Sequence, residues 1–438
     1  MNYQSAIQYL YDRLPVFHHV GSAAYKPGLD NTIKLMNAMN NPQKKFRAIH
    51  VAGTNGKGSV SHLLAAVLQS AGYKTGLYTS PHLVDFGERI KINGKMINPG
   101  YVVDFIEKNN ELFAKVQPSF FEATMAMAFC YFADEKVDIA VIETGLGGRL
   151  DSTNIIEPML SVITNISYDH VAFLGNSLEK IAFEKAGIIK PNTPVVIGEW
   201  QSETFSVFER KAKEEGSDLF LSNEVFSKVC YQQEKMLVEN RNKERYLIGL
   251  NGDYQLKNLS TVLCAIQVFN KLIAQIEINN ANLRVLSLEN IRFGIENVVE
   301  LTGLQGRWQI IQQQPLIVTD TGHNEGGFSY IVQQLQVQKF EKLHIIIGMV
   351  NDKDLSAVLK LLPKKAQYYF TQANIIRALP ANDLHKQGEN YGLTGDSYKS
   401  VKDAINSALT VANPDDFIFI GGSNFVVGEA LQYFRKQI

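Results

Sequence analysis

The sequence predicts an α/β protein with a mainly parallel N-terminal sheet of the P-loop type and a smaller C-terminal α/β domain that is Rossmann-like. Two features predict this fold. Short runs of β-branched and aromatic residues alternate with segments of helical apolar spacing along most of the 438 residues. Several of these runs are apolar throughout, which is typical of parallel strands covered by helices on both faces.

The N-terminal elements follow one another as strand, loop and helix. The run FRAIHVA at 46–52 predicts the first strand, and helical spacing begins after a Gly-rich turn. Further strands are expected at 75–79, 137–143 and 160–166, with helices at 101–116 and 120–133. Between about 205 and 250 the pattern weakens, and the polar run EKMLVENRNKERY at 234–246 predicts a solvated hairpin.

The C-terminal part repeats the alternation after a long helix at 255–274. The stretch ENVVELTGLQGR at 296–307 is expected to be irregular, with Gly303 and Gly306 bracketing a linker. We therefore place a domain boundary near Glu300, which gives domains at 1–299 and 300–438. Strands are expected in LIVTD, KLHIIIGMV and DFIFIGG, each followed by a helix. A cleft between two such domains is a usual place for a small-molecule site.

Composition excludes several classes of protein. The 43 basic and 44 acidic side chains give a net charge of −1, so charge offers no reason to expect a nucleic acid or membrane-surface partner. Three widely spaced cysteines do not predict a disulfide framework. No apolar run approaches the length of a membrane span, and the first residues lack a secretory pattern. We expect a cytoplasmic protein, and nothing demands more than a monomer.

A phosphate-binding loop is expected between the first strand and its helix. Glycines let backbone N–H groups approach an anion, the helix N-terminus adds positive potential, and a lysine can reach the outer phosphates. The general pattern has Gly at 51 and a hydroxyl at 58, whereas this chain has Val51 and Gly58 and defers the hydroxyl. A chance Gly-rich turn is the alternative to an ATP site. The loop residues are Gly53, Thr54, Asn55, Gly56, Lys57, Gly58 and Ser59.

Two side chains follow predicted strands at the edge where open α/β sheets bind ligands. Glu143 ends one buried strand, and Asp169 and His170 follow the next strand-like run. Two neighbouring strand ends could bring Glu143 and His170 to one point, and a carboxylate there suits Mg²⁺. Alone, Glu143 could equally be salt-bridged or solvated, and His170 a hydrogen-bonded structural residue.

Several motifs together resemble the Mur ligase superfamily. They are HVAGTNGKGS from His50, TSPHL from Thr79, ETGLGGRLDSTN from Glu143, DH at 169–170 and EKAGI from Glu184. Within the superfamily the chain is most similar to folylpolyglutamate synthase and its bacterial bifunctional form with dihydrofolate synthase. The resemblance covers nearly the whole chain, and the order and spacing of the motifs carry more weight than the loop alone.

The resemblance implies magnesium, with two ions expected, at Ser80, Glu143 and His170. It also implies that Lys185 is carried as a carbamate that helps to hold a second ion. Burial lowers the pKa of a lysine, and a neutral amine can capture CO₂. Without the resemblance, Lys185 would be read as a surface helix residue.

The resemblance further assigns residues to the two organic substrates. A dihydropteroate-contacting role falls on Ser119, Phe120, Phe121 and Glu122, and on Leu150, Asp151 and Ser152. The alternatives are a buried, paired structural Glu122 and a capped polar turn at Asp151.

ATP contacts are implied at Asn258, Arg307 and Asp320, and His323 matches a further active-site position. Two departures from the family pattern leave the local C-terminal contacts open. Gln305 replaces the usual Pro, and Asp-Thr-Gly-His-Asn-Glu at 320–325 replaces Asp-Gly-Ala-His-Asn-Pro.

Taken together, the residues and the resemblance imply ATP-dependent amide ligation. A substrate carboxylate would attack the γ-phosphate to give an acyl phosphate, and the amine of L-glutamate would displace phosphate. Lys57, Arg307 and the magnesium ions would supply charge neutralisation and alignment. A related amino-acid ligase acting on a cell-wall nucleotide peptide and a non-catalytic nucleotide- or folate-binding protein remain alternatives, and dihydropteroate, reduced folates or both remain open as acceptors.

Overall fold

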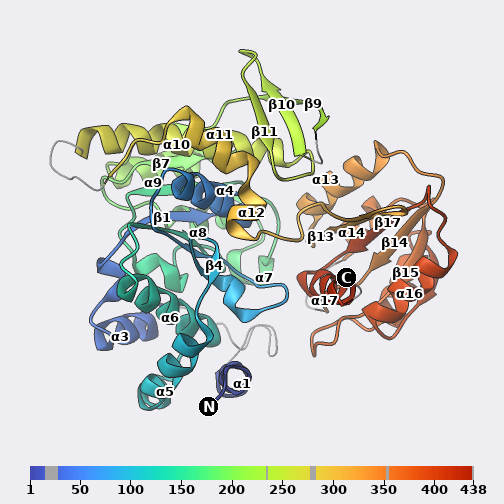
Figure 1. Cartoon of the computed structure of the whole chain (residues 1–438), viewed down its shortest axis with the longest axis horizontal. Coiled ribbons are helices and arrows are strands. Elements are labelled where there is room, and N and C mark those ends of the chain that lie inside the picture. The colour runs from blue at the N-terminus through green and yellow to red at the C-terminus, as the bar shows by residue number, and fades with distance from the viewer. Residues whose placement is uncertain (15–27, 233–234, 277–282, 352–354, 437–438) are drawn as a thin grey trace.

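The protein consists of two α/β domains joined by a short linker, as a computed structural model shows (Figure 1). The structure describes residues 1–14, 28–232, 235–276, 283–351 and 355–436. An eight-stranded sheet lies in the N-terminal domain and a six-stranded sheet in the C-terminal domain, with a separate three-stranded sheet packed beside the first. The predicted fold class is confirmed.

The N-terminal sheet has the strand order β4-β3-β2-β5-β1-β6-β7-β8. The pairings from β2 to β8 are all parallel, and β3, the one strand of this sheet that runs in the opposite direction, pairs antiparallel with β2 and β4 at the edge. The central strands are buried except for Arg47 at the start of β1, which explains their long apolar runs. The strands are β1 Arg47–Ala52, β2 Thr75–Tyr78, β3 Ile90–Ile92, β4 Lys95–Met96, β5 Ile139–Glu143, β6 Leu160–Ile163, β7 Val195–Ile197 and β8 Leu219–Leu221.

Helices cover both faces of this sheet. On one face α4 (Lys57–Ser70), α10 (Gln255–Ile276), α11 (Leu288–Glu296) and α12 (Val298–Thr302) share a core with alternate residues of β1. The opposite face is covered by α1 (Tyr3–Arg13), α3 (Asp30–Ala38), α5 (Pro99–Val116) and α6 (Phe120–Asp134). The remaining helical elements of this domain are η2 Pro42–Lys44, η3 Phe86–Arg89, η4 Ser152–Ile155, α7 Val171–Leu174, α8 Leu178–Ala186 and α9 Phe205–Glu214.

The expected hairpin is present but is not solvated on both faces. Strands β10 (Lys235–Asn240) and β11 (Arg245–Ile248) pair antiparallel, and β9 (Phe226–Gln232) adds a third strand. Met236 and Val238 are fully buried in the core that contains α10 and α11. Most of the polar residues lie at alternate, partly exposed positions of β10 and in the exposed segment at 241–245, whereas Asn240 is buried. Residue 234, where the expected hairpin began, lies outside the described residues.

The stretch expected to be irregular contains a helix. Residues 298–302 form α12, which packs against α4, so the expected boundary at residue 300 falls inside an element of the N-terminal domain. Thr302 is tied to that domain, because its hydroxyl bonds to His62 Nδ1 at 2.8 Å and its carbonyl accepts from Lys91 Nζ at 2.7 Å. Gly303 follows with a φ of 66°. We propose that the boundary lies at residue 303.

The C-terminal sheet has the order β12-β13-β17-β14-β15-β16, and only β12 is antiparallel. Helices α13, α14 and α15 cover one face, and α16 and α17 cover the other. The strands are β12 Gln309–Gln313, β13 Leu316–Asp320, β14 Leu343–Ile347, β15 Gln367–Phe370, β16 Thr394–Ser397 and β17 Phe417–Gly421. The helices are α13 Glu325–Gln336, α14 Ser356–Leu361, α15 Ala381–Glu389, α16 Val401–Val411 and α17 Asn424–Arg435. Within the described residues, no helix combines the length and apolarity that crossing a membrane requires.

The crossing of α11 over α4 depends on a glycine. A Cβ at Gly294 would lie 2.6 Å from Val67 Cα and 2.7 Å from Val67 N. These are backbone atoms of the helix that carries the phosphate loop at its N-terminus, so they cannot move aside as a flexible side chain could.

We expect Gly294→Ala to lower the free energy of unfolding by about 1–3 kcal/mol, because overpacking outweighs the better helix propensity of alanine. Urea unfolding measures the change. Phe293→Ala is the control, since Phe293 on the same helix is 53% exposed and its loss should change stability little. A Gly294→Ala protein as stable as the control would show that the helix crossing can relax.

Candidate active site

Residues of both domains line one cavity of about 370 Å³. Every residue that the sequence singled out lies on its wall, although these residues come from segments more than 250 positions apart in the chain. The loops after β1, β2, β5 and β6 supply most of them, as expected for the carboxyl edge of a parallel sheet. The structure therefore brings the expected residues together, and their individual roles remain predictions.

The phosphate loop is confined by neighbouring elements. Gly53 has a φ of 150°, and a Cβ there would lie 1.8 Å from the hydroxyl of Thr164. Gly56 caps α4 with a φ of 84°, and its Cβ would lie 2.4 Å from Asn258 Oδ1. Only glycine fits at either position. Lys57 begins α4 and donates to Thr54 O at 3.2 Å, so its ammonium group lies at the mouth of the loop.

Glu143 ends β5 in register with Val51 at the end of β1. Its carboxylate is buried and accepts a hydrogen bond from Ser80 N at 3.3 Å. Burial raises the pKa of Glu143 to about 6, while Lys57 acts in the opposite direction. A buried carboxylate beside a phosphate loop is a fitting ligand for a hard divalent cation, which would also satisfy the charge.

The strands that precede Glu143 and His170 were expected to be neighbours in the sheet, and this is wrong. Strand β1 lies between β5 and β6, so the two side chains approach the cavity from either side of the phosphate loop. The described residues contain no group of three or more His, Cys, Asp or Glu side chains arranged to hold a metal ion. An ion here would have few protein ligands and would complete its shell with phosphate oxygens and water, which is how Mg²⁺ is usually bound with nucleotides.

Lys185 is a buried residue of α8, contrary to the surface position expected from the residues alone. Its Nζ donates to Gly53 O at 2.8 Å. Burial lowers the pKa of Lys185 to about 7, and the charge of Lys57 acts in the same direction. The amine is therefore largely neutral slightly above neutral pH, as a carbamate-forming lysine must be.

The wall assigned to the acceptor substrate is fixed by its own hydrogen bonds. Glu122 Oε2 accepts from Ser119 N at 2.7 Å in a capping box, and its Oε1 accepts from Thr32 Oγ1 at 3.2 Å. Asp151 accepts from Gly145 N, Leu146 N and Thr153 N and caps η4. The paired-Glu and capped-turn alternatives thus describe these carboxylates well. Phe120, Phe121, Leu150 and Ser152 complete this part of the wall.

Asp320 connects the two domains. Its Oδ2 accepts from Tyr254 Oη at 2.6 Å and from Trp308 N at 2.8 Å. Tyr254 precedes α10 in the N-terminal domain and was not expected from the sequence. Arg307 donates to Gly306 O at 3.1 Å and to the hydroxyl of Thr321. Thr321, one of the departures from the family pattern, thereby holds the guanidinium at the cavity.

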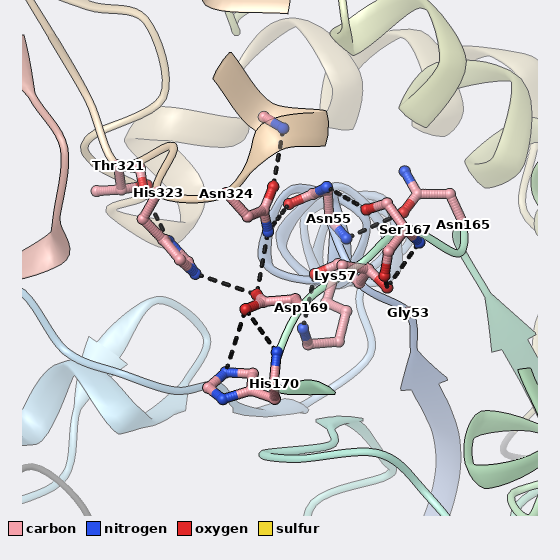
Figure 2. Close-up of polar contacts among 12 residues, drawn as sticks. Gly53, Asn55, Lys57, Asn165, Ser167, Asp169, His170, Thr321, His323 and Asn324 are labelled. Atoms are coloured by element: carbon pink, nitrogen blue, oxygen red, sulfur yellow. Dashed lines mark hydrogen bonds and ion pairs between the residues drawn. The ribbon is translucent and has the colours of Figure 1, made fainter. Parts of the chain in front are cut away.

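A second network crosses the domain interface (Figure 2). Asn324 Nδ2 donates at 3.0 Å both to Asn55 Oδ1 in the phosphate loop and to Asp169 Oδ2. His323 Nε2 lies 3.3 Å from the same Asp169 oxygen. Asn324 Oδ1 meanwhile accepts from Gly327 N and caps α13. The sequence analysis included Asn324 only within the segment at 320–325 and did not predict a contact across domains.

Comparisons with known proteins agree with this arrangement. Residues 51–266 match the Mur ligase middle domain, and residues 306–424 match the glutamate ligase domain of Mur ligases. The chain is 32% identical over 444 residues to the dihydrofolate synthase/folylpolyglutamate synthase of Bacillus subtilis, with 98% of each chain covered.

Solved structures are similar over the full length. E. coli FolC in complex with DHPP and ADP has a TM-score of 0.84 and 27% identity, covering 100% of this chain and 98% of that one. The bifunctional folylpolyglutamate synthase/dihydrofolate synthase from Yersinia pestis, complexed with AMPPNP and a Mn ion, has a TM-score of 0.80 and 26% identity, covering 99% and 98%.

We expect Asn324→Asp to loosen the domain interface. The substitution keeps the oxygen that caps α13 but places a carboxylate against Asp169, so a charge-assisted hydrogen bond becomes a repulsion. Small-angle X-ray scattering should report a larger radius of gyration, and the affinity for Mg-ATP should fall roughly tenfold.

Asn98→Asp is the matched control, because Asn98 caps α5 in the same way, through Gly100 N at 2.7 Å, away from the interface. It should leave both measurements unchanged. Equal scattering curves and affinities for the two variants would contradict a role for Asn324 in docking the domains.

Proposed function

The chain belongs to the Mur ligase family, in its folylpolyglutamate and dihydrofolate synthase branch, and is an ATP-dependent ligase; we propose that it joins L-glutamate to a dihydropteroate or reduced folate carboxylate through an acyl phosphate. The observation that carries the proposal is the single cavity in which the phosphate loop, Glu143 and the acceptor-side wall meet the residues of the C-terminal domain. ATP and a divalent metal belong to this activity, as the nucleotide and metal complexes of related enzymes indicate.

The reaction has two steps. A carboxylate oxygen of the acceptor attacks the γ-phosphorus of ATP, the bond to the bridging oxygen of ADP breaks, and an acyl phosphate forms. The amine of L-glutamate then attacks the acyl carbon, phosphate leaves, and the nitrogen loses a proton. Lys57 and Arg307 offset the phosphate charge that would repel an incoming carboxylate. No protein side chain forms a covalent bond with the substrate.

Nucleotide binding divides between the domains. The phosphate loop and Asn258 belong to the N-terminal domain, and Arg307 and Asp320 to the C-terminal domain. Asp320 Oδ2 already accepts from Tyr254 Oη and Trp308 N. Oδ1 accepts from Gly322 N and can take a further hydrogen bond from a ribose hydroxyl. His323 lies at the interface rather than against the phosphate loop, so we assign it to domain closure together with Asp169.

We propose that the metal is Mg²⁺ in two sites, held by Ser80, Glu143 and His170 and by a carbamate on Lys185. The bound ions supply positive charge that offsets the phosphate charge. The buried, weakly hydrogen-bonded Glu143 and the neutral amine of Lys185 fit this arrangement. We further propose that the protein acts as a monomer, because the two domains of one chain supply every residue assigned to the site. Its cysteines, all free in the structure, agree with a reducing compartment such as the cytoplasm.

We expect the purified protein to release ADP when Mg-ATP, L-glutamate and either 7,8-dihydropteroate or a reduced folate are supplied. Turnover with both acceptors indicates a bifunctional enzyme, and turnover with one shows which activity it has. Lys57→Ala should reduce turnover by about 10²–10³, the usual effect of removing a group that stabilises developing charge. Lys74→Ala is the control, since Lys74 lies in an exposed pair with Glu135. A folded protein that binds ATP but turns over neither acceptor would contradict the proposal.

We expect Lys185 to form a carbamate in solution. Because the pKa of Lys185 is lowered to about 7, its amine becomes neutral as the pH rises through 7, whereas an exposed lysine stays protonated to about pH 10. A ¹³C NMR carbamate signal in labelled bicarbonate should therefore grow between pH 6 and 8. It should be absent in Lys185→Met and present in Lys180→Met, which removes an exposed lysine of the same helix. A signal unaffected by Lys185→Met would refute the assignment.

A further inference from the structure

An arginine that the sequence did not single out lies on the wall of the same cavity. Arg89 ends η3 and is only 2% exposed, yet it lines the cavity. Its carbonyl oxygen accepts from Thr79 N at 3.0 Å, which ties it to the segment that continues into Ser80. Its backbone is thus fixed next to the expected metal ligands.

The guanidinium of Arg89 is held on one edge and one face. Nε donates to His82 Nδ1 at 2.7 Å, and His82 Nε2 lies 3.2 Å from Tyr11 Oη. The guanidinium carbon lies 5.2 Å from the centroid of the Phe120 ring. Phe120 belongs to the acceptor-side wall, so these contacts orient the group between that wall and the segment carrying Ser80.

The charge of Arg89 is not matched by the protein. Among the described residues, no carboxylate lies within ion-pair distance of Arg89, and its side chain makes one hydrogen bond, from Nε, which leaves both terminal nitrogens without an acceptor. The adjacent Glu88 is not available, because its carboxylate accepts from the backbone N–H groups of Leu83, Val84 and Asp85 at 2.8, 3.1 and 3.0 Å. A buried cation with two free donors is costly unless an anion joins it.

We propose that Arg89 binds the carboxylate of the acceptor substrate and holds it for attack on the γ-phosphate, an inference that rests on the proposed function. The fork of a guanidinium matches a carboxylate in shape and charge. Arg89 lies where such a group must lie, with Phe120 on the side of the acceptor and Ser80 and Glu143 on the side of the phosphates. Its interaction with Glu143 is electrostatic and lowers the pKa of that carboxyl, without an ion pair.

The chemistry of the step agrees with this position. The carboxylate must approach the negatively charged phosphates of ATP, and a fixed cation offsets that repulsion while leaving one oxygen directed at phosphorus. That oxygen forms the new bond as the bond to ADP breaks. Arg89 neither gives nor takes a proton, since a guanidinium stays charged at neutral pH.

The test compares two ligands that differ only in the carboxylate. Calorimetry with Mg-AMPPNP present measures the affinity for 7,8-dihydropteroate and for the same pterin carrying aniline in place of 4-aminobenzoate. We expect the wild type to prefer dihydropteroate roughly 10- to 100-fold. Arg89→Gln should bind the two ligands about equally, and Arg89→Lys, which keeps the charge but lacks the fork, should retain part of the preference. The affinity for Mg-AMPPNP should stay within about twofold in both variants.

Arg245→Gln is the matched control, because it removes an exposed arginine of β11 that pairs with Glu239. It should retain the full preference. If Arg89→Gln does not fold, the preference shown by Arg89→Lys decides the question. Three results would overturn the proposal. If Arg89→Gln lowers the affinity for both pterin ligands equally, Arg89 contacts the ring system rather than the carboxylate. If it lowers the affinity for Mg-AMPPNP, Arg89 binds the phosphates, and if the preference for dihydropteroate is unchanged, Arg89 does neither.

If the wild-type protein turns over neither acceptor, the proposed function is wrong, and so is the inference that rests on it. A wild type that turns over dihydropteroate while Arg89→Gln keeps its preference overturns the inference alone. The two failures are therefore distinguishable within one set of measurements.

Discussion

The lack of space around the phosphate loop is the constraint on which the rest of the site depends. Gly53 lies against Thr164 at the end of β6, and Gly56 lies against Asn258 on α10, so the loop is fixed between elements on two sides. Because the loop cannot move, Lys57 at the start of α4 and Asn55 beside it have defined positions. The C-terminal domain then docks onto Asn55 through Asn324. A side chain at either glycine would displace the loop that both domains use.

Burial also explains the charges of the cavity. It raises the pKa of Glu143 and lowers that of Lys185, so each group is less charged than it would be in water. Burial also lowers the pKa of Arg89, but its guanidinium stays charged at neutral pH and has no carboxylate within ion-pair distance among the described residues. Anionic ligands and a divalent ion would relieve all three situations together. The charged forms of these buried groups are therefore unfavourable in the protein alone, and the ligands of a ligase would stabilise them.

The sequence predicted the alternation of strands and helices well, because buried parallel strands carry long apolar runs. It failed where tertiary packing decides the outcome. The run at 298–302 is short and mixed in character, and it becomes helical because it packs on α4. In the sheet β1 lies between β5 and β6, and the order of the strands along the chain does not reveal this. The motifs located the site residues along the chain, but the burial of Lys185, the reach of Asn324 and the unmatched charge of Arg89 depend on contacts between distant segments.

The division of the cavity between domains has a consequence for the order in which ligands leave. The residues assigned to the acceptor, from Ser119 to Glu122 and from Leu150 to Ser152, all belong to the N-terminal domain, as does Arg89. The residues assigned to the nucleotide instead come from both domains, with the phosphate loop on one side of the cavity and Arg307 and Asp320 on the other. If the domains separated, ADP would lose the contacts assigned to the C-terminal domain, whereas the acceptor would keep those assigned to the N-terminal domain. Such a division would let nucleotide exchange while the extended product stays bound, which processive elongation of a glutamate tail would require.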